Sequence, residues 1–305
     1  MANEVSLTNN ADLRIASVLN QEVWQLTSDK VDLRSTCYRI PAAGVVGTLA
    51  VKVPQVLFND IMAAIGEVTD VPPNALENDT VTVTAARQAL RYDPSDEFLI
   101  SGGNTGPAEL ANGLALGYVR RASEMITTLY PSFTAVAGDT TVALTVDDIY
   151  DASFDLEKAD VSGTSPNCVL SPKQFTDFQS SLRGEGGAIQ FVPATADMLA
   201  NKGQGFKGTW NGINFFTSSQ VTDDGTDYYG AMYLPGGIVL LEMPVEVIRT
   251  VIPTNAFLSV AVAGSSMWVE IQRDASKGLT EMVGNGYLGV ALNEDGLGVE
   301  IRSAI

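Results

Sequence analysis

One segment constrains the fold of this chain more than any other: residues 107–130 carry an unbroken apolar stripe at helical spacing. Apolar side chains recur every three or four residues, which predicts an amphipathic helix. The stripe consists of Leu110, Leu114, Tyr118, Ala122, Met125, Ile126 and Leu129, widened by Ala111 and Ala115. Pro131 is expected to end the helix, because a residue before proline disfavours helical backbone. At about 1.5 Å per residue the helix exceeds ~30 Å and is the longest regular element.

The segments before this helix are predicted to be extended. Residues 36–54 and 80–100 alternate apolar and polar side chains. Between them, residues 55–65 have the spacing of a short helix opened by Pro54, and residues 66–79 are rich in turn residues. The glycine-rich SGGNTGP breaks this region from the long helix. The span is interpreted as two long extended arms joined by the segment between them.

Residues 140–190 are predicted to run helix, strand, helix. Thr145 and Asp148 form a capping box, in which each residue satisfies a free backbone N–H of the other. Ser171 and Gln174 repeat the device after a short strand, with Pro172 at the first helical position. The second helix is expected to bury Phe175, Phe178 and Leu182 and to end at Gly184.

The last third of the chain is predicted to be rich in strands. GINFFTSS and YYGAMYLPGGIVLLEM are strand-like, and Asp224-Gly225 between them is a turn signal. Residues 267–272 and 287–292 are further expected strands. NEDG then predicts a turn into GVEIR, which would make a closing hairpin.

Charge excludes several classes of partner. The chain has 305 residues and a formal net charge of −18, and each half holds nine basic and eighteen acidic residues. Clustered Lys and Arg are what nucleic-acid backbones and anionic membranes require, so neither sequence-specific nucleic-acid binding nor membrane binding is expected. The first residues lack the pattern of a signal peptide, and the longest apolar stretches are too short to span a membrane. A cytosolic protein with Cys37 and Cys168 reduced is therefore expected.

No catalytic, cofactor or metal site is predicted. Histidine is absent, which removes the commonest general base and metal ligand and leaves Cys168 without a partner for nucleophilic catalysis. Gly203, Gly205 and Gly208 match a dinucleotide-binding pattern, but they follow a predicted helix and precede a strand, the reverse of the required order. The acidic sets are interpreted as solvated surface: Asp147, Asp148 and Asp151, and Asp223, Asp224 and Asp227.

Residues 11–27 are predicted to form an amphipathic helix that includes Leu13 and Val23. A helix at an untethered terminus docks either on its own domain or on a neighbouring molecule. Leu13 and Val23 are candidate contact residues if the neighbour is chosen, and the sequence leaves both options open.

Four stretches in order resemble a known family. VTVTAARQALRYDPSDEF leads into the long helix. TVDDIYDASFDLEKADV is followed by VLSPKQFTDFQSSL, FKGTWNGINFFTSSQV and finally WVEIQRDASKGLTEMVGNGYLGVALNEDGLGVEI. Together they resemble the major capsid proteins of tailed bacteriophages, the HK-ninety-seven-like fold shared with encapsulin shells. The short helix expected at 55–65 departs from the family pattern, and no Lys–Asn pair with a nearby acid is identifiable for a covalent crosslink.

The resemblance implies an α+β chain with an N-terminal arm, an extended β-loop, a spine helix in a peripheral domain, and an axial domain of mixed sheet and helices. The implied parts are an arm at 1–35, an extended loop region at 36–100, peripheral domain at 101–135, axial domain at 136–258, and closing peripheral strands at 259–305.

The resemblance also implies a non-enzymatic coat protein that self-assembles into the icosahedral head of a tailed phage around double-stranded DNA. Its partners would be copies of itself in hexamers and pentamers, with scaffolding, portal and decoration proteins as further candidates. It would be assembled in the host cytoplasm and end in the virion. Two alternatives stay open: an encapsulin-type compartment shell, and an acidic carbohydrate-active enzyme or adhesin.

Arg87 and Arg91 are further candidate contact residues. They stand four apart in a segment predicted to be extended, so alternation places both on one face. Arginine pairs bidentately with carboxylates, which are abundant on every copy of the chain. The alternative is that both arginines are exposed and pair locally within their own subunit.

Overall fold

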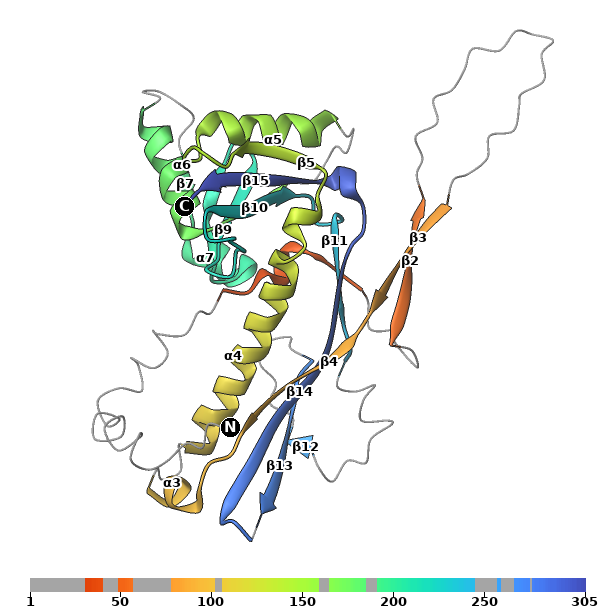
Figure 1. Ribbon diagram of the computed structural model, residues 1–305, viewed down its shortest axis with the longest axis vertical. Coiled ribbons are helices and arrows are strands. Elements are labelled where there is room, and N and C mark those ends of the chain that lie inside the picture. Colours follow the sequence, from red (N-terminus) through yellow and green to blue (C-terminus); the bar gives the residue numbers. More distant parts are fainter. Residues whose placement is uncertain are drawn as a thin grey trace, which may run out of the picture.

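The structure, a computed structural model, describes residues 31–40, 49–56, 78–101, 106–158, 165–184, 191–244, 257–258, 266–274 and 276–305. Its two large β-sheets are organised around a single long helix, α4 (Gly106–Thr127). One sheet gathers with several shorter helices at one end of α4, and the other runs alongside it, so the molecule is elongated (Figure 1). Helices and mostly antiparallel strands occur together, as the α+β prediction requires.

The first sheet has seven strands in the order β5-β15-β10-β6-β9-β8-β7. The pairs β15/β5 and β6/β9 are parallel, and the other neighbours are antiparallel. In chain order the strands are β5 (Ala135–Asp139), β6 (Asn167–Leu170), β7 (Val192–Pro193), β8 (Phe206–Trp210), β9 (Ile213–Thr217), β10 (Asp227–Tyr233) and β15 (Gly298–Ala304). Since β6 lies between β9 and β10, the Asp224-Gly225 turn does not join two paired strands.

Two helices, α5 (Val146–Lys158) and α6 (Pro172–Gly184), pack on this sheet, and α7 (Ala196–Lys202) lies beside β8. Under α5 and α6 the core is aromatic. Phe178 stacks on Phe215 with ring centroids 4.8 Å apart and meets the edge of Trp210 at 5.5 Å, and all three are almost fully buried. We call α5, α6 and the seven-stranded sheet the axial unit.

Both predicted capping boxes are confirmed. Asp148 Oδ2 accepts hydrogen bonds from Thr145 N (2.8 Å) and Oγ1 (2.7 Å), and the Asp148 amide donates to Thr145 Oγ1 (3.4 Å). Gln174 Oε1 accepts from Ser171 N (3.0 Å), and the Gln174 amide donates to Ser171 Oγ (3.1 Å). These bonds satisfy donors that the first helical turn leaves free, which fixes where α5 and α6 begin.

The second sheet has six strands, in the order β1-β11-β14-β13-β12 with β4 also paired to β14. The strands are β1 (Tyr38–Arg39), β4 (Ala86–Tyr92), β11 (Ile238–Glu242), β12 (Phe257–Leu258), β13 (Trp268–Asp274) and β14 (Leu279–Leu292). Short 3₁₀ turns connect these parts: η1 (Leu33–Thr36), η4 (Tyr130–Ser132) and η6 (Asp295–Leu297).

The predicted stripe of α4 packs on one face of this sheet. Leu114, Tyr118, Ala122 and Ile126 are at most 5% exposed. The approach is close because β14 carries glycine beneath it: a Cβ on Gly286 would stand 2.2 Å from Tyr118 Cε2. The helix ends at Thr127, and Pro131 lies in η4 just beyond it.

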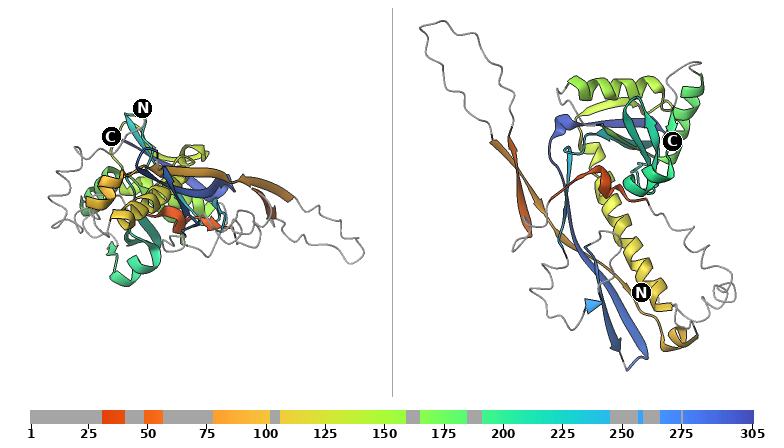
Figure 2. Two further views of the ribbon diagram at one scale, coloured as in Figure 1. Left: turned by 90° about the horizontal axis from the view of Figure 1, so that it is seen from below. Right: turned by 180° about the vertical axis from the view of Figure 1, so that it is seen from behind.

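A third, two-stranded sheet pairs β2 (Ala50–Val56) with β3 (Asn78–Thr84) and points away from the body, as Figures 1 and 2 show. The short helix expected behind Pro54 is wrong at its start, because Pro54 pairs with Thr80 inside this sheet. Proline is tolerated on an edge strand, where its missing N–H faces no partner. Most of residues 55–65 and 66–79, like 11–27, lies outside the described residues.

The extended prediction for 80–100 is wrong at its end, where α3 (Asp96–Ser101) forms. Ser95 Oγ accepts a hydrogen bond from Phe98 N (3.2 Å), an N-terminal cap, and Asp96 and Glu97 favour the first helical turn.

The expected closing hairpin is also wrong. β14 belongs to the six-stranded sheet, whereas β15 lies between β5 and β10 in the seven-stranded one. The chain crosses between the sheets at 293–297, beside the earlier crossing from β10 to β11 at 234–237. Leu234 N donates to Leu297 O and Asn293 N to Gly237 O. Backbone hydrogen bonds therefore join the two crossings to each other, whereas a hairpin turn would have formed such bonds between its own two strands.

Candidate assembly surfaces

Arg87 and Arg91 both lie in β4 on the face of the six-stranded sheet that points away from α4. Arg87 donates from Nε (2.9 Å) and Nη2 (2.6 Å) to Asn285 Oδ1 of β14. Arg91 pairs with Glu281 of β14 (2.7 Å) and with Asp93 (2.6 Å). The sheet thus places the two arginines on one face, with partners inside the same subunit, and their contact role stays a prediction.

This face of the sheet is covered at one end and open at the other. At the covered end, the β2–β3 hairpin packs an apolar layer against β11, in which Val83, Leu241 and Trp268 are buried. At the open end, Ala89, Arg91 and Gln272 are exposed, and Val283 between them is half-buried. We call this open end, defined by Ala89, Arg91, Gln272 and Val283, the open face.

The described chain begins in a buried charged junction that the sequence interpretation missed. Arg34, in η1, is 1% exposed and pairs with Asp32 (2.7 Å) and with Glu242 of β11 (2.9 Å). The Tyr118 hydroxyl of α4 donates to the same Glu242 (3.4 Å). The segment that follows the predicted arm is thereby tied to both the spine helix and the six-stranded sheet.

The buried charges of this junction offset the cost of one another's burial. Burial alone raises the pKa of Asp32, but the hydrogen bonds and charge of Arg34 outweigh it, so the pKa lies below its ordinary value. The pKa of Arg34 is raised, because its two carboxylate partners outweigh the cost of burying it. The junction lies within the predicted arm at 1–35, and its local signal in the sequence is Asp32, which caps η1 by accepting a hydrogen bond from Arg34 N.

A second polar cluster joins η1 to the axial unit. Thr36 Oγ1 lies 2.6 Å from the Tyr233 hydroxyl, and Asn167 Nδ2 donates to Thr36 O (3.1 Å). Cys37 and Cys168 are free and buried, in agreement with the predicted reduced pair. Burial raises the pKa of the Cys37 thiol to about 12, which keeps it protonated and unreactive.

The candidate chemical motifs have structural roles. Gly203 and Gly205 lie between α7 and β8, and Gly208 lies within β8, the helix-to-strand order expected from the sequence. Asp224 accepts hydrogen bonds from the Tyr229 hydroxyl, Thr226 and the Asp227 amide, which lower the pKa of its carboxyl. Within the described residues, no three metal-ligating side chains gather, and no helix has the length and apolarity to cross a membrane.

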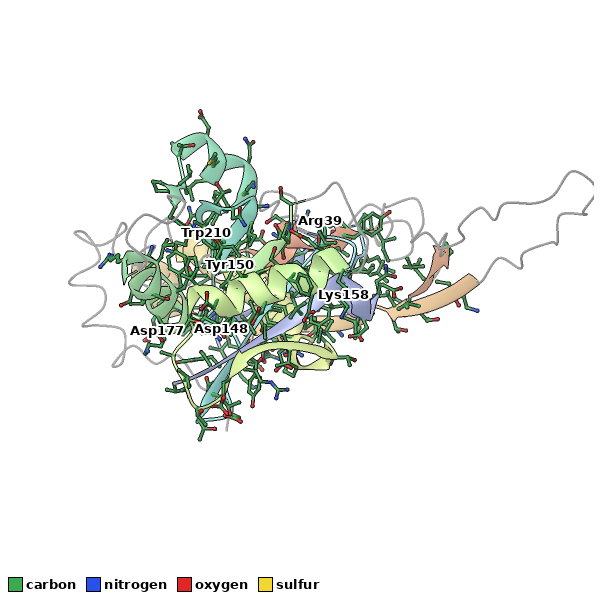
Figure 3. All side chains as sticks on the ribbon, turned by 90° about the horizontal axis from the view of Figure 1, so that it is seen from above. Arg39, Asp148, Tyr150, Lys158, Asp177 and Trp210 are labelled. Atoms are coloured by element: carbon green, nitrogen blue, oxygen red, sulfur yellow. The ribbon has the colours of Figure 1, made fainter. Side chains whose placement is uncertain are left out.

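Exposed aromatic side chains on α5 are a surface feature that the sequence interpretation did not single out. Phe154 is 64% exposed and Tyr150 41%, although Tyr150 also meets the edge of Trp210 at 5.0 Å. Figure 3 shows α5 crossing the end of the axial unit, with Tyr150 toward its start, Lys158 at its far end and Asp177 of α6 beside its first turns. Leu13 and Val23 lie outside the described residues, so their contact role also stays a prediction.

No protein-family model matches the chain, and no curated protein matches it. Solved structures do. The acid-stable capsid of Helicobacter pylori bacteriophage KHP30 has a TM-score of 0.63 at 13% identity, covering 100% of this chain and 99% of the other. A structure of Mycobacterium phage Che8 has 0.59 at 15% identity, covering 90% and 92%. An encapsulin of Synechococcus elongatus has 0.55 at 16% identity, covering 95% and 94%. The chain has the fold of tailed-phage major capsid proteins, as the resemblance implied.

Proposed function

We propose that this chain is the major coat subunit of a tailed-phage head, which self-assembles into an icosahedral shell around double-stranded DNA. The observation that carries the proposal is the fold itself, matched over nearly the whole length of a chain from the capsid of bacteriophage KHP30. The role is structural rather than catalytic, and it needs broad contact surfaces instead of a reactive site.

The form of the molecule supports this role. The β2–β3 hairpin reaches away from the body, where a neighbouring subunit can bind it (Figure 2). The exposed apolar residues of the subunit are spread over several elements, for example Ile100 of α3 (80% exposed), Phe154 of α5 and Ile271 of β13. Subunits that bury such surfaces against several neighbours form the large interfaces of permanent assemblies.

We also propose which oligomers the chain forms, where it assembles and which other proteins take part. Copies of the chain form hexamers and pentamers, assembled in the host cytoplasm and retained in the virion, with scaffolding, portal and decoration proteins as further partners. The charge of −18 fits a wall that contains packed DNA without binding it tightly. Arg87 and Arg91, together with Leu13 and Val23 of the N-terminal arm, are proposed contact residues.

An encapsulin-type compartment is the second candidate, because an encapsulin shell matches 95% of the chain. The two functions differ in what the shell contains. Shells isolated from the native source contain a genome and a portal if the first proposal is right, and a cargo protein if the second is.

Sedimentation of the purified chain tests the proposal. Capsomer rings or closed shells, visible by negative-stain electron microscopy, are expected as protein concentration rises. A compact monomer of 32.3 kDa at every salt and protein concentration would contradict both candidates.

A further inference from the structure

The outward stripe of α5 combines exposed aromatic rings with carboxylates. Tyr150 and Phe154 stand one turn apart on it, and Asp147, Asp151 and Glu157 are exposed around them. The helix as a whole carries five carboxylates against one lysine. Large exposed aromatic side chains on a helix are typical of a surface that another molecule covers.

The outward stripe of α6 has the opposite charge. Lys173, Thr176, Ser180 and Arg183 are exposed at three- and four-residue spacing. The acid of this helix, Asp177, is 16% exposed and already paired with Lys173. Because Lys173 is partnered by Asp177, Arg183 supplies the net positive charge of α6, which is opposite in sign to the charge of α5.

The spacing of the charges on the two helices also matches. Asp147 and Glu157 are separated by ten residues, as are Lys173 and Arg183, which corresponds to about 15 Å along each axis. When the stripes are laid together, an acid meets a base at each end. With Glu157 opposite Arg183, Phe154 lies between the two ends, over the polar middle of α6 and within reach of the arginine for a cation–π contact.

The two stripes cannot meet within one subunit. Val146 N of α5 donates to Ser181 Oγ of α6 (3.2 Å), and both helices bury their apolar sides in the same core, so both stripes point outward. A second copy must supply the partner stripe. We propose that α5 of one subunit packs against α6 of the next, a head-to-tail contact that closes into a ring when repeated. The inference rests on the proposed function and assigns the contact that builds its rings.

Charge reversal on either helix tests the contact. One variant carries Asp147→Arg and Glu157→Arg, and the other Lys173→Glu and Arg183→Glu; all four positions are exposed. Each variant alone is expected to assemble at least ten-fold less readily than the parent, measured as the concentration at which rings appear by sedimentation. The chain with all four changes has the parent's net charge and serves as the matched control, and it is expected to assemble within about three-fold of the parent.

Mixing the two defective variants gives a second readout specific to a head-to-tail contact. Each reversed helix then finds its opposite on the other variant, so alternating rings with an even number of copies are expected. Rings with an odd number are not, since they would contain one like-charged contact. Thermal unfolding verifies that each variant is folded, and Phe154→Ser, which leaves every charge in place, is expected to weaken ring formation in the same assay.

Two results would overturn the contact. One is single-helix reversals that assemble like the parent, and the other is folded variants that fail to recover in both the four-change chain and the mixture. If one of these results is found and the parent chain still forms rings, the α5–α6 contact is wrong but the proposed function stands. A parent that stays monomeric overturns both.

Discussion

The axial unit and the six-stranded sheet handle their exposed surfaces differently. In the axial unit, α5 and α6 cover an aromatic core on one face, and η1 and η4 contribute to the core on the other, so strands such as β6 are buried along their whole length. The six-stranded sheet is covered by α4 on one face, but on the other the hairpin covers one end and leaves the open face exposed. The difference indicates that the core strands of the axial unit are covered within one subunit, whereas the six-stranded sheet keeps an open face that the proposed neighbours would cover.

The largest expected effect lies in the axial core. Phe178→Ala removes a fully buried ring that touches Phe215 and Trp210, and it is expected to lower the free energy of unfolding by about 4 kcal/mol. Phe154→Ala on the neighbouring helix is the matched control, expected to change it by less than about 0.5 kcal/mol because that ring is exposed. Urea unfolding of the dissociated subunit measures both. Similar losses of unfolding free energy in the two variants would contradict an axial core that is formed within one subunit.

The junction between the regions is expected to show the next largest effect. Arg34→Met leaves Asp32 and Glu242 without their buried cation, so the free energy of unfolding is expected to fall by about 3 kcal/mol. Arg39→Met is the control, because Arg39 is 43% exposed and stands 3.9 Å from the same Glu242. Arg34→Met is expected to lower the free energy of unfolding much more than Arg39→Met in the same denaturant titration.

The junction also predicts a dependence on pH. The folded-state pKa of Asp32 lies below its unfolded value of about 4, so its stabilising contribution is complete above pH ~4 and is lost as pH falls through the folded-state pKa. Asp32→Asn is expected to flatten the fall of stability below pH ~4. It does not abolish that fall, since Asp224 also has a lowered pKa. An unchanged slope in acid unfolding titrations of the variant would show that Asp32 does not contribute to the loss of stability in acid.

The two arginines of β4, Arg87 and Arg91, are expected to show the smallest effect on the isolated subunit. Arg87→Glu with Arg91→Glu should leave the subunit folded, because both arginines are exposed. Assembly is expected to weaken, and to change its dependence on salt, since exposed charges are screened within about 8–10 Å. Lys207→Glu, an exposed change in β8 of the axial unit, is the control. Shells that form as readily from the double variant as from the parent would remove the arginines from the contact.

The features predicted correctly from sequence are those whose signal is local. The stripe of α4 and the boxes at Ser171 and Thr145 depend on residues three or four positions apart, so reading along the chain was enough. The closing hairpin failed because alternation in GVEIR indicates a strand without naming its partners, which are β5 and β10. Arg34 was missed for the same reason, since its partner Glu242 is 208 positions away.

Part of the candidate interface stays a prediction. The division into arm, loop, axial and peripheral segments rested on resemblance. Sheet membership cuts across it, because β11 joins the six-stranded sheet and β15 the seven-stranded one. The exposed aromatic pair of α5 was not singled out, although the spacing that buries Ile149 and Ala152 places Tyr150 and Phe154 together on the opposite side of the helix.

Hydrogen–deuterium exchange on free and assembled subunits tests most directly whether neighbours complete the six-stranded region. The backbone amides of β6, β9 and β10 are expected to be protected in both states. Those of β2, β3 and β4 are expected to gain protection only on assembly. Equal protection of β2, β3 and β4 in the free and assembled subunit would contradict the account, and so would a gain confined to the strands of the axial unit.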